Sequence, residues 1–150
     1  MIKKINNQNE EVSRQIRTLF QASYQVEADL LKVTNFPPLN RKLDQFVNSD
    51  TEFYGLFRAQ EIAAIVEVKT DTKNTDIHSL VVQPDYFRQG LGRELMQFVL
   101  NTFNSESFTV ETGVDNGPAT NLYQQLGFVE QQQWDTEFGI RKVRFKRTRT

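Results

Sequence analysis

The most informative stretch of this chain runs from residue 81 to residue 93 and reads Val81-Val82-Gln83-Pro84-Asp85-Tyr86-Phe87-Arg88-Gln89-Gly90-Leu91-Gly92-Arg93. A strand end is followed there by a turn with two glycines, and apolar residues at helical spacing come next. Glycine lets backbone amides approach a ligand closely, and the first amides of a helix lack internal acceptors and lie at the positive end of its dipole. The turn therefore predicts an anion site suited to phosphate, with an ordinary tight connection as the alternative interpretation.

Two familiar phosphate-binding motifs do not fit this turn. The third glycine of G-x-G-x-x-G is missing, because Arg93, Glu94 and Leu95 follow Gly92. The Gly-Lys-Ser/Thr sequence of a P-loop is missing as well. A phosphate site here is therefore neither a standard dinucleotide site nor a standard nucleoside-triphosphate site.

Length and composition exclude several classes of protein. A chain of 150 residues predicts one domain, and a net charge of −1 gives no reason to expect a strongly charged partner. No apolar run approaches membrane-spanning length and the N-terminus lacks a signal-peptide core, so we expect a cytoplasmic protein without membrane contact. With no cysteine and His78 as the single histidine, we expect no disulfide, no thiolate nucleophile and no metal site.

Hydrophobic periodicity predicts strands and helices in the order β-α-α-β-β-β-α-β-α-β-β. The predicted strands are residues 2–5, 53–58, 62–69, 76–82, 108–112, 129–134 and 140–147. The predicted helices are residues 10–24, residues 39–48, a helix from the glycine turn to about residue 103, and one from residue 116 to Gly127. Pro37 and Pro38 predict a loop between the first two helices. This order implies an α/β fold with a mixed central sheet flanked by helices.

A second informative stretch runs from residue 110 to residue 128, where a strand end, a loop and a helix start follow one another. Together with the glycine turn, it resembles the GNAT superfamily of acetyl-CoA-dependent N-acetyltransferases. The first stretch is similar to that family's acyl-CoA pyrophosphate loop, Gln/Arg-x-x-Gly-x-Gly/Ala. The second is similar to its Asn-x-x-Ala-x-x-Leu-Tyr-x-x-x-Gly-Phe element, here Asn116, Ala119, Leu122, Tyr123, Gly127 and Phe128.

The resemblance implies that residues 1–150 form one GNAT-type domain with the acyl-CoA N-acyltransferase fold. It implies acetyl-CoA as the acyl donor, no metal, and direct transfer of the acetyl group to an amine on a small molecule or a peptide. The alternative is a non-catalytic acyl-CoA-binding regulatory module of the same fold. Retention of Tyr123 favours an enzyme, because binding alone does not need a thiol acid at that position.

The resemblance also implies roles for individual residues. The cofactor would lie between two parallel strands that splay apart, with the Val82 amide polarising the thioester carbonyl and Tyr123 protonating the departing thiolate. Phe87 stands where the family has Gln or Arg, which puts a side-chain contact from that position in doubt. The cofactor-binding residues that it implies are Leu80, Val81, Val82, Arg88, Gln89, Gly90, Leu91, Gly92, Arg93 and Asn116.

The base that activates the amine stays open between several groups. Glu111 matches a position, five before the loop asparagine, that serves as base in protein N-terminal acetylating members of the family. Asp76 and His78 on the neighbouring strand are a second choice, and a water relay is a third. A strict period of two predicts that Asp76, His78, Leu80 and Val82 share one face of their strand.

The family's acceptor pocket is walled by the segment after the first helix and by the last hairpin. Aromatic and acidic residues in these segments could bind a cationic amine, with an ordinary surface loop as the alternative. They are Tyr24, Glu27, Asp29, Phe36, Trp134 and Phe138. The basic C-terminal run alternates with Val143 and Phe145, which indicates a half-solvated strand rather than a nucleic-acid surface. The sequence leaves the oligomeric state open, a homodimer included.

Overall fold

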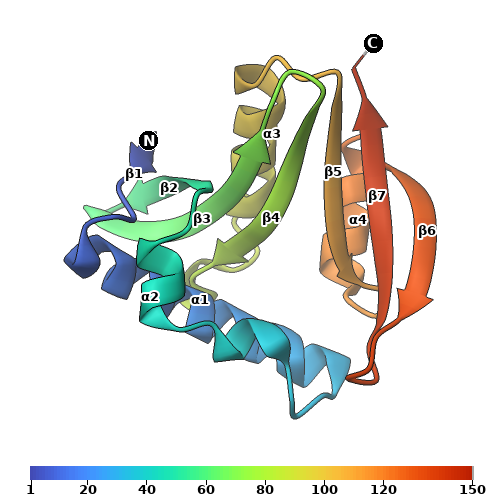
Figure 1. Cartoon of the computed structure of the whole chain (residues 1–150), viewed down its shortest axis with the longest axis horizontal. Helices are drawn as coiled ribbons and strands as arrows, with labels where there is room; N and C mark the ends of the chain where they lie inside the picture. Colours follow the sequence, from blue (N-terminus) through green and yellow to red (C-terminus); the bar gives the residue numbers. More distant parts are fainter. Residues whose placement is uncertain (150) are drawn as a thin grey trace.

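A mixed β-sheet forms the centre of the protein, and the computed structural model describes residues 1–149. The strands are β1 (Ile2–Ile5), β2 (Glu52–Arg58), β3 (Glu61–Thr70), β4 (Asn74–Val82), β5 (Ser107–Gly113), β6 (Val129–Asp135) and β7 (Arg141–Thr148). The helices are α1 (Glu10–Leu31), α2 (Leu43–Val47), α3 (Leu91–Thr102) and α4 (Gly117–Gln125), with short 3-10 turns η1 (Pro37–Asn40) and η2 (Pro84–Tyr86). The sheet order is β1-β2-β3-β4-β5-β7-β6, which confirms the predicted mixed sheet flanked by helices (Figure 1).

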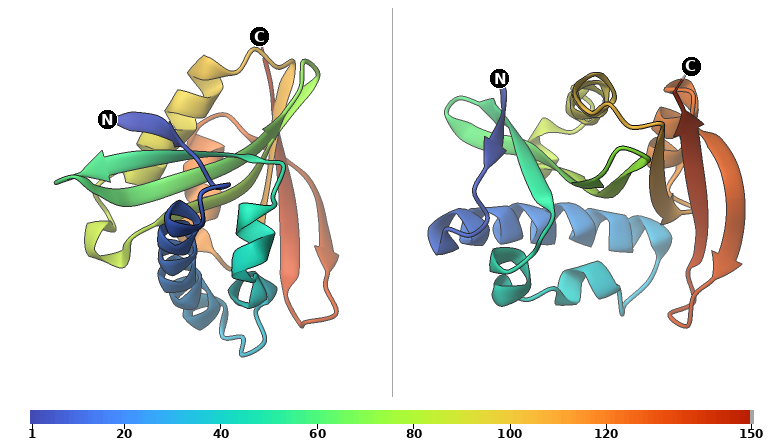
Figure 2. Two further views of the ribbon diagram at one scale, coloured as in Figure 1. Left: turned by 60° about the vertical axis from the view of Figure 1, so that its left-hand side comes forward. Right: turned by 45° about the horizontal axis from the view of Figure 1, so that its top comes forward.

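Helices cover both faces of the sheet (Figure 2). Neighbouring residues of β3 point to opposite faces, as a period of two requires. Ile65 packs with Ile16 and Phe20 beneath α1 and α2, whereas Val66 packs with Val99 beneath α3. None of the helices within residues 1–149 combines the length and apolarity needed to cross a membrane.

Helix α1 is two turns longer than predicted. The Asn9 side chain caps its start by accepting from Val12 N, and Lys32 ends it in a left-handed conformation with φ 58°. The predicted end at Tyr24 is wrong, because Ala28 continues the buried face of the helix at 1% exposure. Glu27 and its polar neighbours suggested a loop, but these side chains occupy other faces of the same helix.

The second predicted helix is shorter than expected and divided. Residues 39–48 do not form one helix, because η1 ends at Asn40 and α2 begins only at Leu43. Between them Arg41 is extended, with φ −68° and ψ 124°. Phe46 still faces the core as predicted, at 1% exposure.

The two parallel strands of the sheet pair over only part of their length. Residues Asn74–Ile77 of β4 pair with Ser107–Val110 of β5, but β4 continues to Val82 and β5 to Gly113. The two strands diverge beyond the paired segment, and α1 crosses beneath the divergent ends (Figure 1). The backbone edge of β4 therefore lacks a strand partner from His78 onward on its β5 side.

A β-bulge at His78 lies where the two strands separate. The register with β3 shifts there, since Glu67 pairs with Ser79 and Val68 pairs with Ile77. A bulge adds one residue and reverses the alternation of side chains. The predicted common face of Asp76, His78, Leu80 and Val82 is therefore wrong. Beyond the bulge, Leu80 and Val82 join Ile77 on the α3 side, and Val81 packs beneath α1.

A buried ion pair ties the segment before α2 to the sheet. The Arg41 guanidinium donates to both Glu67 carboxylate oxygens, at 2.8 and 3.0 Å, and lies 4.1 Å from the centre of the Phe46 ring. Thr51 and Ser79 donate to the same carboxylate at 2.6 and 3.0 Å. Burial alone would raise the pKa of the Glu67 carboxyl, but the hydrogen bonds and charge of Arg41 hold it below 4.5.

Glu67→Gln should lower the free energy of unfolding by about 3 kcal/mol, because it leaves the Arg41 charge without its buried partner. Urea denaturation measures this, with Glu61→Gln, an exposed change on the same strand, expected to stay within about 0.5 kcal/mol of the parent. Since the folded-state pKa of Glu67 lies below 4.5, its stabilisation is fully present above that pH and disappears as pH falls through the folded-state value. Equal stability of the Glu67→Gln and parent proteins at neutral pH would contradict this account.

Candidate active site

The divergent ends of β4 and β5 border a cleft of about 1520 Å³ that runs from the glycine turn to the hairpin between β6 and β7. Most of the residues that the sequence predicted for the site line it. They are Leu80, Val82, Arg88, Gly90, Leu91, Gly92, Arg93, Glu111, Asn116 and Tyr123. Val81 and Gln89 do not, because Val81 is buried beneath α1 and Gln89 is exposed on the turn.

The glycine turn presents free amides to one end of the cleft. Gly90 precedes α3 with φ 79°, and Arg88 also has a positive φ, of 65°. The Glu94 amide donates to the Gly90 carbonyl at 3.0 Å as the first bond of the helix. The amides of Leu91–Arg93 therefore have no internal acceptors. A Cβ on Gly90 would meet nothing within 4 Å, so this glycine is required for its φ rather than for space.

Phe87 lies at the mouth of the same end and is 37% exposed. An aromatic ring has no hydrogen to donate to an anion. The donors that line the cleft at this turn are therefore backbone amides and the side chains of Arg88 and Arg93, of which Arg93 already donates to Gln125.

The amide of Val82 faces the open edge of β4. The next amide, that of Gln83, donates to the Ala63 carbonyl at 2.8 Å and so points toward β3. Successive strand amides point in opposite directions, so the Val82 amide points away from β3. Its acceptor is the Ser23 hydroxyl of α1, at a long 3.3 Å.

Tyr123 is buried in the wall of the cleft. It is 4% exposed, and its ring lies 5.9 Å from that of Phe128 and 6.0 Å from that of Phe145. Burial raises the pKa of the Tyr123 hydroxyl, and the nearby charge of Glu27 raises it further. The hydroxyl therefore keeps its proton at neutral pH and can donate it.

Asn116 connects the start of α4 to α1. Its side-chain oxygen accepts from Ala119 N at 3.2 Å and caps the helix, while its amide nitrogen donates to Glu27 Oε1 at 2.6 Å and to Thr112 Oγ1 at 3.4 Å. Burial raises the pKa of the Glu27 carboxyl above 4.5, against the opposing effects of the Asn116 hydrogen bond and the Lys142 charge. A carboxyl group with a perturbed pKa in a cleft is a candidate functional group.

The sequence predicts Glu27 only as part of the acceptor wall and not as a catalytic group. The signal that could have found it is helical spacing, since Glu27 follows Ser23 by four residues and Tyr24 by three, so all three share one face. That spacing was hidden by the early predicted end of the helix.

Glu111 lies at the rim of the cleft with both of its oxygens paired. Oε1 is 3.6 Å from Lys142 Nζ, and Oε2 is 3.2 Å from Arg144 Nη1. Both cations come from β7, the strand antiparallel to β5. The negative charge of Glu111 is therefore balanced by two positive charges of the neighbouring strand.

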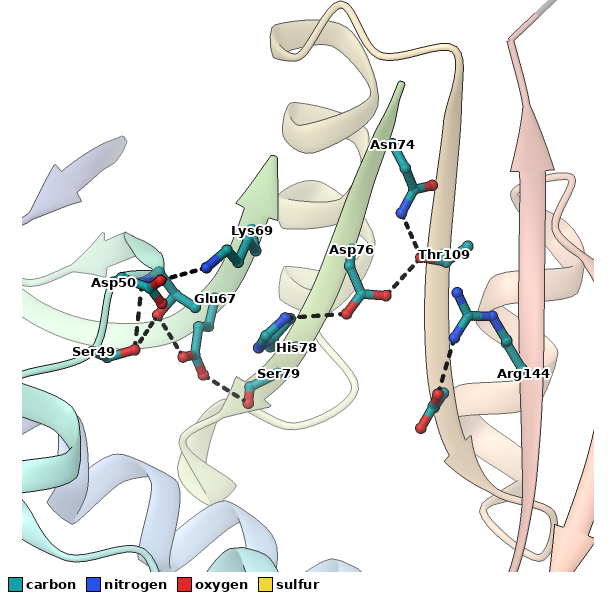
Figure 3. A network of polar contacts seen from close by, with 12 residues as sticks. Ser49, Asp50, Glu67, Lys69, Asn74, Asp76, His78, Ser79, Thr109 and Arg144 are labelled. Carbon is teal, nitrogen blue, oxygen red and sulfur yellow. Dashed lines mark hydrogen bonds and ion pairs between the residues drawn. The ribbon is translucent and has the colours of Figure 1, made fainter. Parts of the chain in front are cut away.

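Asp76 and His78 form a hydrogen-bonded pair across the bulge (Figure 3). His78 Nε2 lies 3.1 Å from Asp76 Oδ2, and Thr109 donates to Asp76 Oδ1 at 2.6 Å. The hydrogen bond with Asp76 raises the pKa of His78 above 6.5. Of the pair, His78 lines the cleft. Within residues 1–149, no cluster of three or more metal-ligating side chains is placed to hold a metal ion.

Apolar side chains gather at the other end of the cleft. Val26 and Leu30 of α1 and Phe138 of the last hairpin are 40 to 45% exposed, and all three line the cleft. Phe36 and Trp134 line the same end, as the sequence predicted. The cleft therefore joins a set of free amides at one end to an apolar surface at the other, with Tyr123 between them.

The chain is similar in sequence to known proteins. The chain is 30% identical over 129 residues to UPF0157 protein YqkA of Bacillus subtilis, a match that covers 85% of this chain and 38% of that protein. It is 34% identical over 70 residues to the [Ribosomal protein bS18]-alanine N-acetyltransferase of Escherichia coli, which covers 45% of this chain and 46% of that one. The matched segments thus span less than half the length of each of these two relatives.

The fold is also that of a solved structure. The crystal structure of the ribosomal-protein-S18-alanine N-acetyltransferase from Escherichia coli superposes with a TM-score of 0.78 at 19% identity, covering 99% of this chain and 92% of that one. The family model described as "Acetyltransferase (GNAT) family" matches residues 14–128, a range that includes most of α1, the glycine turn and the Asn116–Phe128 element. The chain therefore belongs to the GNAT acetyltransferase family.

Proposed function

We propose that this protein is an N-acetyltransferase that moves the acetyl group of acetyl-CoA directly to an amine. The observation that carries the proposal is a cleft that joins the free amides in the first turn of α3, the open edge of β4 and the buried Tyr123. Family membership supports the same chemistry, and so does the name of the Escherichia coli relative.

The free amides of the turn are suited to the pyrophosphate of the acyl donor. Their hydrogens converge at the positive end of the α3 dipole, which favours an anion. The missing side-chain donor at Phe87 does not remove this interaction, because backbone amides supply it. The adjacent arginines, Arg88 and Arg93, add positive charge.

The open edge of β4 is suited to the pantetheine arm, which can bond to it as an added strand. At its end the Val82 amide can donate to the thioester carbonyl oxygen, which would replace the Ser23 hydroxyl at 3.3 Å. Asn116 stands beside this path, but its side-chain groups already bind Ala119 and Glu27. A direct contact from Asn116 to the arm can use its side-chain oxygen, which has a second lone pair beside the one that accepts from Ala119 N.

The transfer itself needs one acid and one base. A neutral amine attacks the thioester carbon, a tetrahedral intermediate forms, and its collapse breaks the carbon–sulfur bond. Tyr123 is suited to protonate the departing thiolate because its hydroxyl stays protonated in the wall of the cleft. Glu111 and the Asp76–His78 pair are candidate bases near the cleft.

Thiol release from acetyl-CoA on a panel of primary amines tests the function. An N-acetyltransferase releases coenzyme A only when an acceptor amine is present. A protein that is stabilised against heat by acetyl-CoA but releases no thiol with any amine would instead be a non-catalytic binding module.

Tyr123→Phe should lower kcat about 100-fold, because it removes the proton that the thiolate receives. The KM for acetyl-CoA should stay within about twofold, since the ring and its packing are kept. Tyr54→Phe is a matched control, because Tyr54 packs against Phe98 outside the cleft. An unchanged kcat in the Tyr123→Phe protein would remove the acid role.

Gly90→Val should weaken acetyl-CoA binding about tenfold or more, because a β-branched residue is strained at φ 79° and the turn must move to relieve it. Isothermal titration calorimetry measures this. Gly139→Val carries a similar penalty at φ 78° in the last hairpin and should leave acetyl-CoA affinity unchanged. Equal affinities for the two variants would show that the glycine turn does not hold the donor.

A further inference from the structure

Glu27 is the most enclosed of the acidic side chains that line the cleft. The others, Glu111 and Glu137, are exposed at its rim, whereas Glu27 lies on α1 where that helix crosses beneath the divergent strands. Its position relative to Tyr123 is set by a rigid connection. Asn116 caps α4 with one side-chain group and holds Glu27 Oε1 at 2.6 Å with the other, and Tyr123 is on that same helix.

The second oxygen of this carboxylate is unengaged. Within residues 1–149, Glu27 Oε2 has no hydrogen-bond or ion-pair partner, so it is available to a ligand in the cleft. The charged group that acts on Glu27 is the ammonium of Lys142, and the charge of Glu27 in turn acts on the hydroxyls of Tyr24 and Tyr123. Lys142 Nζ is placed against Glu111, at 3.6 Å. Glu27 thus lacks a direct cationic partner that would offset its burial.

We propose that Glu27 receives the ammonium group of the acceptor and takes its proton, a role that rests on the proposed N-acetyltransferase function. The ammonium donates to Oε2 and passes one proton to the carboxylate. The neutral amine then forms the carbon–nitrogen bond to the thioester carbon, and the carbon–sulfur bond breaks as Tyr123 protonates the sulfur. The second proton leaves the new amide nitrogen for solvent. Tyr123 regains a proton through solvent as Glu27 releases the one that it took, so acetyl-CoA and an ammonium yield an amide, coenzyme A and one proton.

The other candidate carboxylates, Glu111 and Asp76, are less available. Both Glu111 oxygens face cations of β7, at 3.6 and 3.2 Å. Both Asp76 oxygens are engaged, one by Thr109 and one by His78. Of these three carboxylates, only Glu27 has a free oxygen in the part of the chain that the structure describes. The Asn116 bond fixes its orientation, and it lines the cleft together with Tyr123.

The surroundings of Glu27 also indicate the class of acceptor. Val26 and Leu30, its neighbours on α1, are 40 and 45% exposed and line the cleft, as does Phe138 of the last hairpin, which is 40% exposed. Exposed apolar side chains beside a cleft mark a binding surface. The acceptor is therefore a primary amine with an apolar group next to it, as in an arylalkylamine or a peptide whose first residue is apolar.

The acceptor class is tested by steady-state kinetics with four amines. 2-Phenylethylamine and a peptide beginning with Leu should have kcat/KM values about tenfold or more above those of spermidine and of a peptide beginning with Asp. Which of the two apolar amines is better distinguishes a small molecule from a peptide terminus. Better turnover of spermidine or of the Asp peptide would overturn the assigned class.

The role of Glu27 is tested with Glu27→Gln, which keeps the bond from Asn116 but removes the charge. With the better apolar amine, kcat/KM should fall about 100-fold at neutral pH while the KM for acetyl-CoA is unchanged. The working form of Glu27 is deprotonated, so parent activity rises with pH through its raised pKa. This rise of kcat/KM on the acidic side of the pH profile, the acidic limb, should be absent from Glu27→Gln. The loss of kcat/KM relative to the parent should become smaller at high pH, where the amine is already neutral.

Glu11→Gln, an exposed change of the same type on α1, should match the parent. Glu27→Asp should keep the acidic limb with a lower kcat, which tests the role even where Glu27→Gln does not fold. The proposal is overturned where Glu27→Gln retains the limb, or where Glu111→Gln loses it instead. Parent protein that releases no thiol with any amine refutes the proposed function itself, and this role with it.

Discussion

The early end of pairing between β4 and β5 is the constraint on which the rest of the site depends. Parallel strands normally satisfy each other's backbone groups along their whole length. Here the ladder stops at Ile77 and Val110, and the bulge at His78 lies at the same level. The amide of Val82 is left at an open edge with only a long contact to Ser23. A sheet that stayed paired to its end would have neither the cleft nor the free amide.

Helix α1 converts this opening into an enclosed site. Its second half crosses beneath the divergent strands and brings Ser23, Tyr24 and Glu27 to one face. Burial there raises the pKa of both the Glu27 carboxyl and the Tyr123 hydroxyl, so one group is made more basic and the other is kept protonated. The Arg41–Glu67 pair holds the following segment against β3, which keeps that side of the cleft in place.

Much of the fold could be predicted because its signals are local. The strands of the sheet and helices α3 and α4 follow from hydrophobic periodicity within each segment, and Gly90 follows from the positive φ that its turn requires. The predictions failed where contacts between residues distant in the sequence determine the local structure. Residues 25–31 are helical although Glu27 suggested a loop, and the bulge at His78 reverses a face that strict alternation would have kept.

The chain's own order of residues was enough to specify most of its elements, the phosphate-type turn and the Tyr123 motif, because each of these depends on backbone preferences and spacing within a few residues. The pair of Arg41 and Glu67, the position of Glu27 and the ion pairs of Glu111 were decided only by the tertiary structure. Glu27 and Asn116 are 89 residues apart in the chain and meet at 2.6 Å. Burial and partner charge set the chemistry of a carboxylate, and both come from neighbours that only folding assembles.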